Sequence, residues 1–294
     1  MYKAIAANKR NTVLIMAVFV GIISAIGFVV SYLYGNTNIT YYVIVGAVLY
    51  AWLQYYLATS LAVAMTGARQ IEKRDNPRFY RIVENLAITT GMQTPKVYII
   101  DDAAPNAFAT GRDPKHAIVA ATTGLIDMMS DSELEAVMAH EMGHVQNYDI
   151  RISMIAFGLV SAVGLLTDIV LRMLWFGGDN RRDNDNNSPI MMIVGVVVLI
   201  LAPIIAAIVQ MAISRQREYL ADATSAMTTR NPDSMISALE KLKADGRPMK
   251  RQNSATAHLY ISNPLKTGFF GKLFSTHPPL EDRIKRLRDN ANKF

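Results

Sequence analysis

Long uncharged runs alternate with charged segments along this chain. Residues 12–34 and residues 39–65 contain no Asp, Glu, Lys or Arg over 23 and 27 positions. An α-helix needs about 20 mainly apolar residues to cross the hydrocarbon core of a bilayer. The pattern therefore predicts a transmembrane hairpin over residues 1–68, and its alternative is a buried helical hairpin in a soluble protein.

Two later apolar runs, residues 153–176 and residues 190–213, are interrupted by a few polar side chains such as Asp168 and Arg172. The polar connector GGDNRRDNDNNSP lies between them and is unsuited to apolar lipid. An Asp and an Arg four positions apart lie on one helix face and can pair. We therefore expect a second transmembrane hairpin over residues 153–213, which makes four membrane helices in all.

The composition narrows the chemistry that the chain can perform. There are no cysteines, which excludes disulfides, thiolate metal ligands and a cysteine nucleophile. The net charge is +6, but the basic residues are dispersed among acidic ones and show no nucleic-acid-binding signature. We expect the positive charge to interact with anionic headgroups of a lipid bilayer, and we expect no nucleic-acid partner.

The distribution of Lys and Arg predicts which side of the membrane each segment faces. Three lie before the first run and none in the link 35–38, whereas residues 66–152 carry nine and the tail from residue 214 carries fifteen. Basic residues collect on the cytoplasmic side of membrane proteins. Residues 69–152 and 214–294 are therefore expected to form two parts of one cytoplasmic catalytic domain.

The segment between the predicted hairpins resembles a small α+β unit over residues 76–125. The stretch PRFYRIVENLAITTGM has helical spacing and ends near Gly91, a residue type that commonly terminates helices. KVYIID and HAIVAATTGLI are rich in β-branched and small apolar residues and predict two strands.

The next helix carries the chemistry. Ser130 and Glu133 form a capping-box pattern at its start. Further on, His140 and His144 lie four positions apart on one helix face, which lets two imidazoles converge on one metal ion. Glu141 projects beside that position, where a general base can take a proton from the attacking water. The alternative is a solvated helix face. The apolar stripe on which the helix packs lies away from the histidines and comprises Leu134, Met138, Met142 and Val145.

A hydrolytic zinc site needs a third protein ligand and an open position. A third histidine six residues after the second is excluded, because that position holds Ile150. Asp168 lies within a predicted span, and Asp149 lies beyond the predicted helix. Glu218 begins EYLAD just after the fourth run, on the same side of the membrane as the histidines, and is the predicted ligand. Asp222, one helical turn later, can orient a zinc-bound histidine. For both acidic residues the alternative is a solvated helix face.

HEMGH, EYLAD after a membrane hairpin and THPPLEDR near the end of the chain together resemble the HtpX-type membrane metalloproteases, relatives of the CAAX prenyl proteases. The resemblance covers essentially the whole chain. It implies an integral membrane α-helical protein with four transmembrane helices and a cytoplasmic α+β zincin-like (gluzincin) metalloprotease domain. It also implies one Zn²⁺ per chain, held by His140, His144 and Glu218, with Glu141 as the general base and Asp222 behind a ligand.

The same resemblance extends to three further residues. It places His277 and Arg283 at the active site, where His277 is suited to donate a hydrogen bond to an oxyanion or to occupy the open metal position in a resting state. The alternative for Arg283 is the basic run RIKRLR in contact with lipid headgroups. PNAFATG lies near an edge strand that pairs with extended substrates. Asn106 in this stretch is a candidate substrate contact, and its alternative is an ordinary turn asparagine.

Together these observations predict a zinc-dependent endopeptidase of a bacterial inner (cytoplasmic) membrane, multi-pass, with its active site on the cytoplasmic side. The resemblance implies quality control of unfolded or damaged membrane proteins under stress. One alternative is a processing protease for a single membrane-associated substrate, such as a prenylated peptide. Another is an inactive membrane scaffold, against which the intact Glu141 argues. The sequence does not indicate an oligomeric state.

Overall fold

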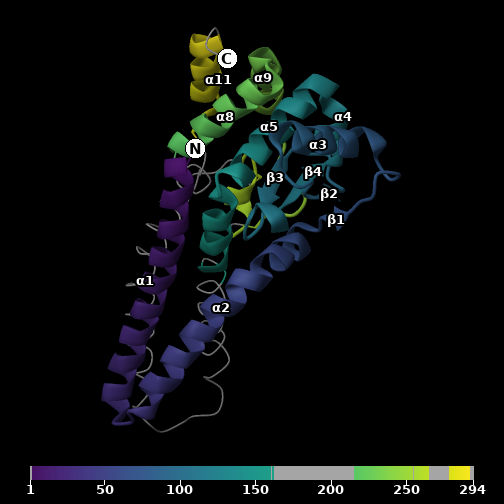
Figure 1. The fold of residues 1–294 in the computed structure, drawn as a ribbon. Helices are drawn as coiled ribbons and strands as arrows, with labels where there is room; N and C mark the ends of the chain where they lie inside the picture. The colour runs from purple at the N-terminus through teal and green to yellow at the C-terminus, as the bar shows by residue number, and fades with distance from the viewer. Residues whose placement is uncertain (1, 160, 162–214, 254, 265–277, 292–294) are drawn as a thin grey trace.

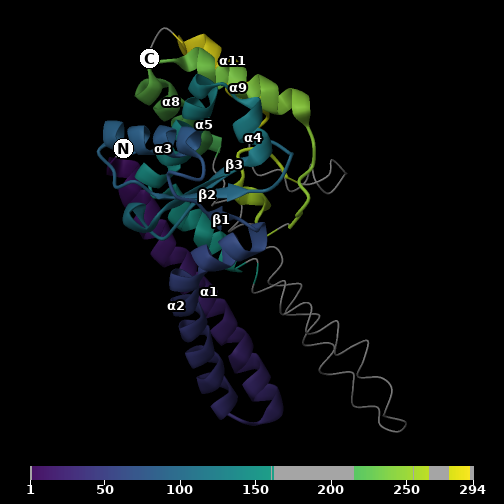
Figure 2. The same ribbon diagram turned by 90° about the vertical axis from the view of Figure 1, so that its right-hand side faces the viewer.

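The structure is a computed structural model that describes residues 2–159, 161, 215–253, 255–264 and 278–291. Helices α1 (Tyr2–Tyr34) and α2 (Asn38–Thr66) form a long hairpin that projects from an α+β domain, as Figure 1 shows. Figure 2 shows that the hairpin tip lies at the opposite end of the molecule from the C-terminal helices. The predicted second hairpin lies almost entirely outside the described residues.

The outer surface of the α1–α2 hairpin is apolar. Within it, Ile5–Ala25 and Asn38–Thr66 are long and apolar enough to cross a membrane, yet only 17% and 11% of their most apolar windows are buried. A soluble protein rarely exposes so much contiguous apolar surface. This exposure argues against the buried hairpin of a soluble protein and is consistent with insertion into a bilayer. The exposed side chains include Phe28, Tyr32, Val45, Trp52 and Leu57.

A four-stranded sheet of order β1-β2-β4-β3 lies at the centre of the domain. β2 and β4 run parallel, whereas the β1–β2 and β3–β4 pairs are antiparallel. Side chains from one face of the sheet share a core with the helices above it, and those from the other face share a second core with residues of α1 and α2 and of the segments 152–159 and 249–260. The strands are β1 (Arg69–Gln70), β2 (Lys96–Ile100), β3 (Ala107–Thr110) and β4 (Ile118–Thr122).

The predicted strand HAIVAATTGLI is shorter in the structure. Its first residue belongs to the 3-10 helix η1 (Pro114–His116), and the strand ends at Thr122, where α4 (Thr123–Met128) begins. The Thr122 hydroxyl accepts the backbone N–H of Leu125 at 3.2 Å and so caps the new helix. This capping bond, which the apolar composition of the stretch does not reveal, explains the difference.

The two helices predicted around the metal motif are both present. α3 (Pro77–Thr90) ends at the left-handed Gly91, and α5 (Asp131–Gln146) begins with the capping box of Ser130 and Glu133. However, α5 is buried on nearly all sides rather than along one apolar stripe, because α3, the sheet and the C-terminal helices surround it. His140 and Glu141 are therefore buried as well.

The C-terminal part of the chain packs over α5. Helix α8 lies along α5, α9 packs against α8 and the start of α5, and α11 packs against α8 and α9. Segments separated by residues 162–214 therefore share one core. The elements are α8 (Arg215–Thr229), α9 (Pro232–Asp245), the 3-10 helix η3 (Ala257–Leu259) and α11 (Leu280–Asn290).

Candidate metal centre

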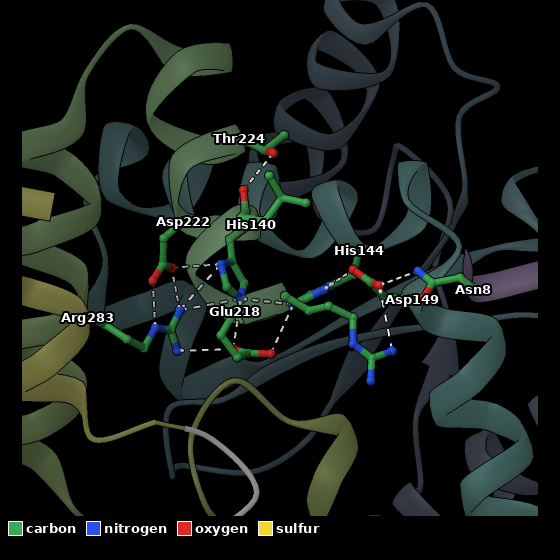
Figure 3. A network of polar contacts seen from close by, with 10 residues as sticks. Asn8, His140, His144, Asp149, Glu218, Asp222, Thr224 and Arg283 are labelled. Carbon is green, nitrogen blue, oxygen red and sulfur yellow. Dashed lines mark hydrogen bonds and ion pairs between the residues drawn. The ribbon is translucent and has the colours of Figure 1, made fainter. Parts of the chain in front are cut away.

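His140 and His144 of α5 and Glu218 of α8 meet at one point (Figure 3). The Nε2 atoms of the two histidines are 3.2 Å apart. A Glu218 carboxylate oxygen lies 3.7 Å from Nε2 of His140, and the other lies 3.4 Å from Nε2 of His144. One donor atom from each residue lies within 4.8 Å of the other two. The structure thus brings together the three residues that the sequence predicts as metal ligands.

Small residues at the contact between α5 and α8 let the two helices pack closely enough for Glu218 to reach the histidines. A Cβ atom at Gly143 would lie 3.4 Å from the Thr224 side chain and 3.6 Å from Cα of Ala221. The buried hydroxyl of Ser225 donates to the carbonyl of Ala136 at 2.6 Å and ties the two helices together. Glu218, Ala221 and Ser225 recur at helical spacing, so they share the face of α8 that meets α5.

Asp222 and Arg283 support His140 from behind. Nδ1 of His140 lies 2.9 Å from Asp222, which in turn accepts hydrogen bonds from Nε and Nη2 of Arg283 at 2.9 and 2.6 Å. Burial raises the pKa of Asp222, but the charge of Arg283 and the bond from His140 outweigh it and hold that pKa below its ordinary value. Asp222 therefore stays ionised and accepts a hydrogen bond from Nδ1–H of His140.

Arg283 is completely buried and belongs to the site rather than to the exposed basic face of α11. Its Nη1 atom also lies 3.6 Å from Glu218. This position favours the active-site expectation over contact with lipid headgroups. Its shortest contacts are to Asp222, and its Nη2 atom also lies 3.3 Å from Nδ1 of His140.

Asp149 supports His144 as Asp222 supports His140, a role that the sequence alone did not predict. Its Oδ2 lies 3.1 Å from Nδ1 of His144, and its Oδ1 accepts a hydrogen bond from Asn8 at 2.7 Å. The sequence places Asp149 beyond the helix, and this was sufficient ground to reject it as a ligand. A metal-bound imidazole needs a hydrogen-bond acceptor at Nδ1, and this requirement of His144 could have pointed to Asp149.

The donor set fits a metal ion. Carboxylates hold both Nδ1 atoms, so both Nε2 lone pairs are directed to the common point beside Glu218. Burial lowers the pKa of His144, but the charges of Glu218 and Asp149 outweigh it and raise the pKa to about 9 when no metal is bound. This concentration of buried negative charge around two imidazoles favours a cation at that point.

Glu141 lies beside the two histidines on α5 and is buried, with 2% of its surface exposed. Its negative charge contributes to raising the pKa of both His144 and Arg283, so it lies within electrostatic range of them. The position is compatible with the predicted role as general base. His277, the predicted oxyanion donor, lies outside the described residues.

Asn106 does not reach a substrate surface in this structure. It is 2% exposed, and its side-chain amide bonds both the carbonyl and the N–H of Ser262, at 2.8 and 3.2 Å. The outer edge of β3 is also engaged, because Ile261 donates to the carbonyl of Ala107 at 2.9 Å and Phe108 pairs with Tyr260. Asn106 thus anchors another segment of the chain, which pairs with the start of β3, and its contact with substrate stays a prediction.

Residues 73–291 match Peptidase family M48. The chain belongs to this family. The M48 protease is 56% identical over 295 residues to the protease HtpX homolog of Tropheryma whipplei (strain Twist), with 100% of both chains covered. It is 44% identical to the protease HtpX homolog of Streptococcus gordonii, over 98% of this chain and 99% of the relative.

The fold of the M48 protease is also similar to a solved structure. The crystal structure of S. mikatae Ste24p superposes with a TM-score of 0.52 at 18% sequence identity, and covers 98% of this chain and 67% of that chain. The chain is therefore an HtpX-type M48 metalloprotease with a membrane-type M48 fold. The cluster of His140, His144 and Glu218 is its candidate metal centre.

Proposed function

We propose that this M48 protease is a zinc-dependent endopeptidase that hydrolyses misfolded or damaged membrane proteins in a bacterial cytoplasmic membrane. The observation that carries the proposal is the convergence of His140, His144 and Glu218, each histidine with a carboxylate at its Nδ1. Two imidazoles and one carboxylate with an open fourth position are typical of catalytic zinc sites. Without cysteine in the chain, thiolate ligands are excluded.

Each side chain has a definite task in hydrolysis. When bound, zinc acts as a Lewis acid that polarises the scissile carbonyl and makes water a stronger nucleophile. His140, His144 and Glu218 would hold the ion. Glu141 takes a proton from the attacking water and returns it to the leaving amine. His277 is proposed to donate a hydrogen bond to the oxygen on which negative charge develops.

The position of the site beside a membrane hairpin supports membrane-associated substrates. The apolar surfaces of α1 and α2 support a position of the domain next to a bilayer, where unfolded segments of membrane proteins emerge. The distribution of Lys and Arg supports four spans with the active site at the cytoplasmic face. The bacterial relatives named protease HtpX homolog support a protease over an inactive scaffold.

The proposal is tested with the full chain purified in detergent. We expect one zinc ion per chain and hydrolysis of casein, and we expect Glu141→Gln to keep the zinc but lower hydrolysis about 10²–10⁴-fold. Glu135→Gln on the same helix is the control and should retain activity. Hydrolysis that survives Glu141→Gln, or wild-type protein that binds no zinc in chelator-free buffer, would overturn the mechanism. A destabilised membrane protein should be cleaved faster than its folded parent, and equal rates would contradict the substrate class.

A further inference from the structure

Both histidines of the metal centre are held by a carboxylate that is itself held by a residue near one end of the chain. Behind His140, Asp222 is held by Arg283 of α11. Behind His144, Asp149 is held by Asn8 of α1, 141 positions earlier in the sequence. Figure 3 shows Asn8 and Arg283 on opposite sides of the site. The membrane hairpin therefore contributes a side chain to the surroundings of the metal centre.

Asn8 is buried and makes two hydrogen bonds to the turn that follows α5. Its Nδ2 donates to Oδ1 of Asp149 at 2.7 Å and to the carbonyl of Asn147 at 2.8 Å. Only 7% of Asn8 is exposed, although it lies on a helix whose surface is otherwise largely open. The carbonyl of Asn147 lies at the C-terminal end of α5, where carbonyls have no partner within the helix.

The turn needs this support because its backbone is strained. Tyr148 adopts a left-handed conformation with φ of 62°, which is unfavourable for a residue other than glycine. The reversal directs the Asp149 side chain back toward His144, five positions earlier. Lys9 of α1 lies 4.5 Å above the Tyr148 ring, so neighbouring residues of α1 contact both the side chain and the backbone of the turn.

We propose that Asn8 is a positioning residue of the metal centre: it holds Asp149, which orients His144, so the seating of the first membrane helix controls the affinity for the metal. The inference rests on the proposed zinc site. Nη1 of Arg217 also lies 3.8 Å from Oδ1 of Asp149, so Asn8 supplies the hydrogen bond and Arg217 a nearby positive charge to the carboxylate that orients His144.

The affinity for zinc of the full chain in detergent, measured by competition with a chelator, tests this inference. We expect Asn8→Ala to weaken zinc binding about 10–100-fold, the range observed when partners of metal ligands are removed. Asn8→Asp preserves the shape but places a second negative charge beside Asp149, so it should weaken binding at least as much. The matched control is Asn11→Ala on the same helix, since Asn11 makes no side-chain hydrogen bond within the described part of the chain.

A double variant separates positioning from mere anchoring of α1. If Asn8 acts through Asp149, then Asn8→Ala should change zinc affinity less than about threefold in an Asp149→Ala background. Equal losses with and without Asp149 would overturn the inference, as would unchanged affinity in both Asn8 variants. The absorption spectrum of the cobalt-substituted protein should also change for Asn8→Ala and not for Asn11→Ala. Wild-type protein that binds no zinc would instead overturn the proposed function itself.

Discussion

Arg283 and Asp222 form a buried, two-pronged ion pair directly behind His140. The two hydrogen bonds measure 2.6 and 2.9 Å, and no part of Arg283 is exposed. A buried charge without its partner is costly, so each residue depends on the other. The pair joins α11 to α8 and so ties the last described helix of the chain to the metal centre.

Substitution of Arg283 should therefore affect both stability and metal binding. We expect Arg283→Met to lower the free energy of unfolding by about 3–5 kcal/mol, because the Asp222 carboxylate remains buried without its cation. Zinc affinity should fall about 10–100-fold, since Asp222 no longer orients His140 firmly. Thermal unfolding and zinc titration in detergent measure the two effects. Lys285→Ala on the exposed side of α11 is the control, and unchanged zinc affinity in Arg283→Met would make the pair purely structural.

Removal of Glu218 should abolish stable zinc binding. We expect Glu218→Ala to purify with far less than one zinc ion per chain and to remain membrane-inserted, because the substitution lies outside the apolar hairpin. Zinc content by atomic absorption and membrane fractionation measure these outcomes. Gln216→Ala, at an exposed position of the same helix, should retain its zinc. A Glu218→Ala protein with full zinc content would show that another residue is the third ligand.

Glu133 should make folding stability depend on pH in the acidic range. Burial raises its pKa, but the ion pair with Lys241 and hydrogen bonds from Ser237 and Ser130 outweigh it and lower the pKa to about 2. A depressed carboxyl pKa stabilises the fold fully above the unfolded value of 4.5, and the contribution is lost as the pH falls from there toward 2.

We therefore expect Glu133→Gln to lower the free energy of unfolding by about 1–2 kcal/mol at pH 7, a value that allows for the partly exposed Lys241. The difference from wild type should shrink as the pH is lowered from about 4.5 toward 3, where the carboxyl gains its proton more readily in the unfolded chain. Unfolding measured at several pH values tests this sign. A difference that stays constant down to pH 3 would contradict the role of the ionised carboxylate, and Glu135→Gln provides the control.

Gly143 should tolerate a methyl group but nothing larger. A Cβ atom there meets Thr224 at 3.4 Å, which is an ordinary van der Waals contact, so Gly143→Ala should keep its zinc and its activity. Gly143→Leu should displace α8 and separate Glu218 from the histidines, with loss of zinc and a lower melting temperature. If Gly143→Leu retains wild-type zinc affinity, then the close approach of α5 and α8 does not set the position of the third ligand.

Several features followed from short stretches of sequence because their physical causes are local. The capping box of Ser130 and Glu133 and the end of α3 at Gly91 are present as predicted, since helix ends depend on a few neighbouring residues. His140 and His144 share a helix face because they lie four positions apart on α5. The end of β4 at Thr122 was predicted wrongly, because the capping hydroxyl is hidden in a run of small apolar residues.

The sequence alone determined the residue types of the metal centre and their spacing within each helix, because one turn of helix sets which side chains are neighbours. It also indicated Glu218 through a charge pattern that predicts two distant segments on the same side of a membrane. Only the tertiary structure decided that Asp149 holds His144, that Asn8 holds Asp149, and that Asn106 contacts Ser262. These contacts join residues from separate elements, and their existence depends on how buried polar groups find partners once the helices have packed.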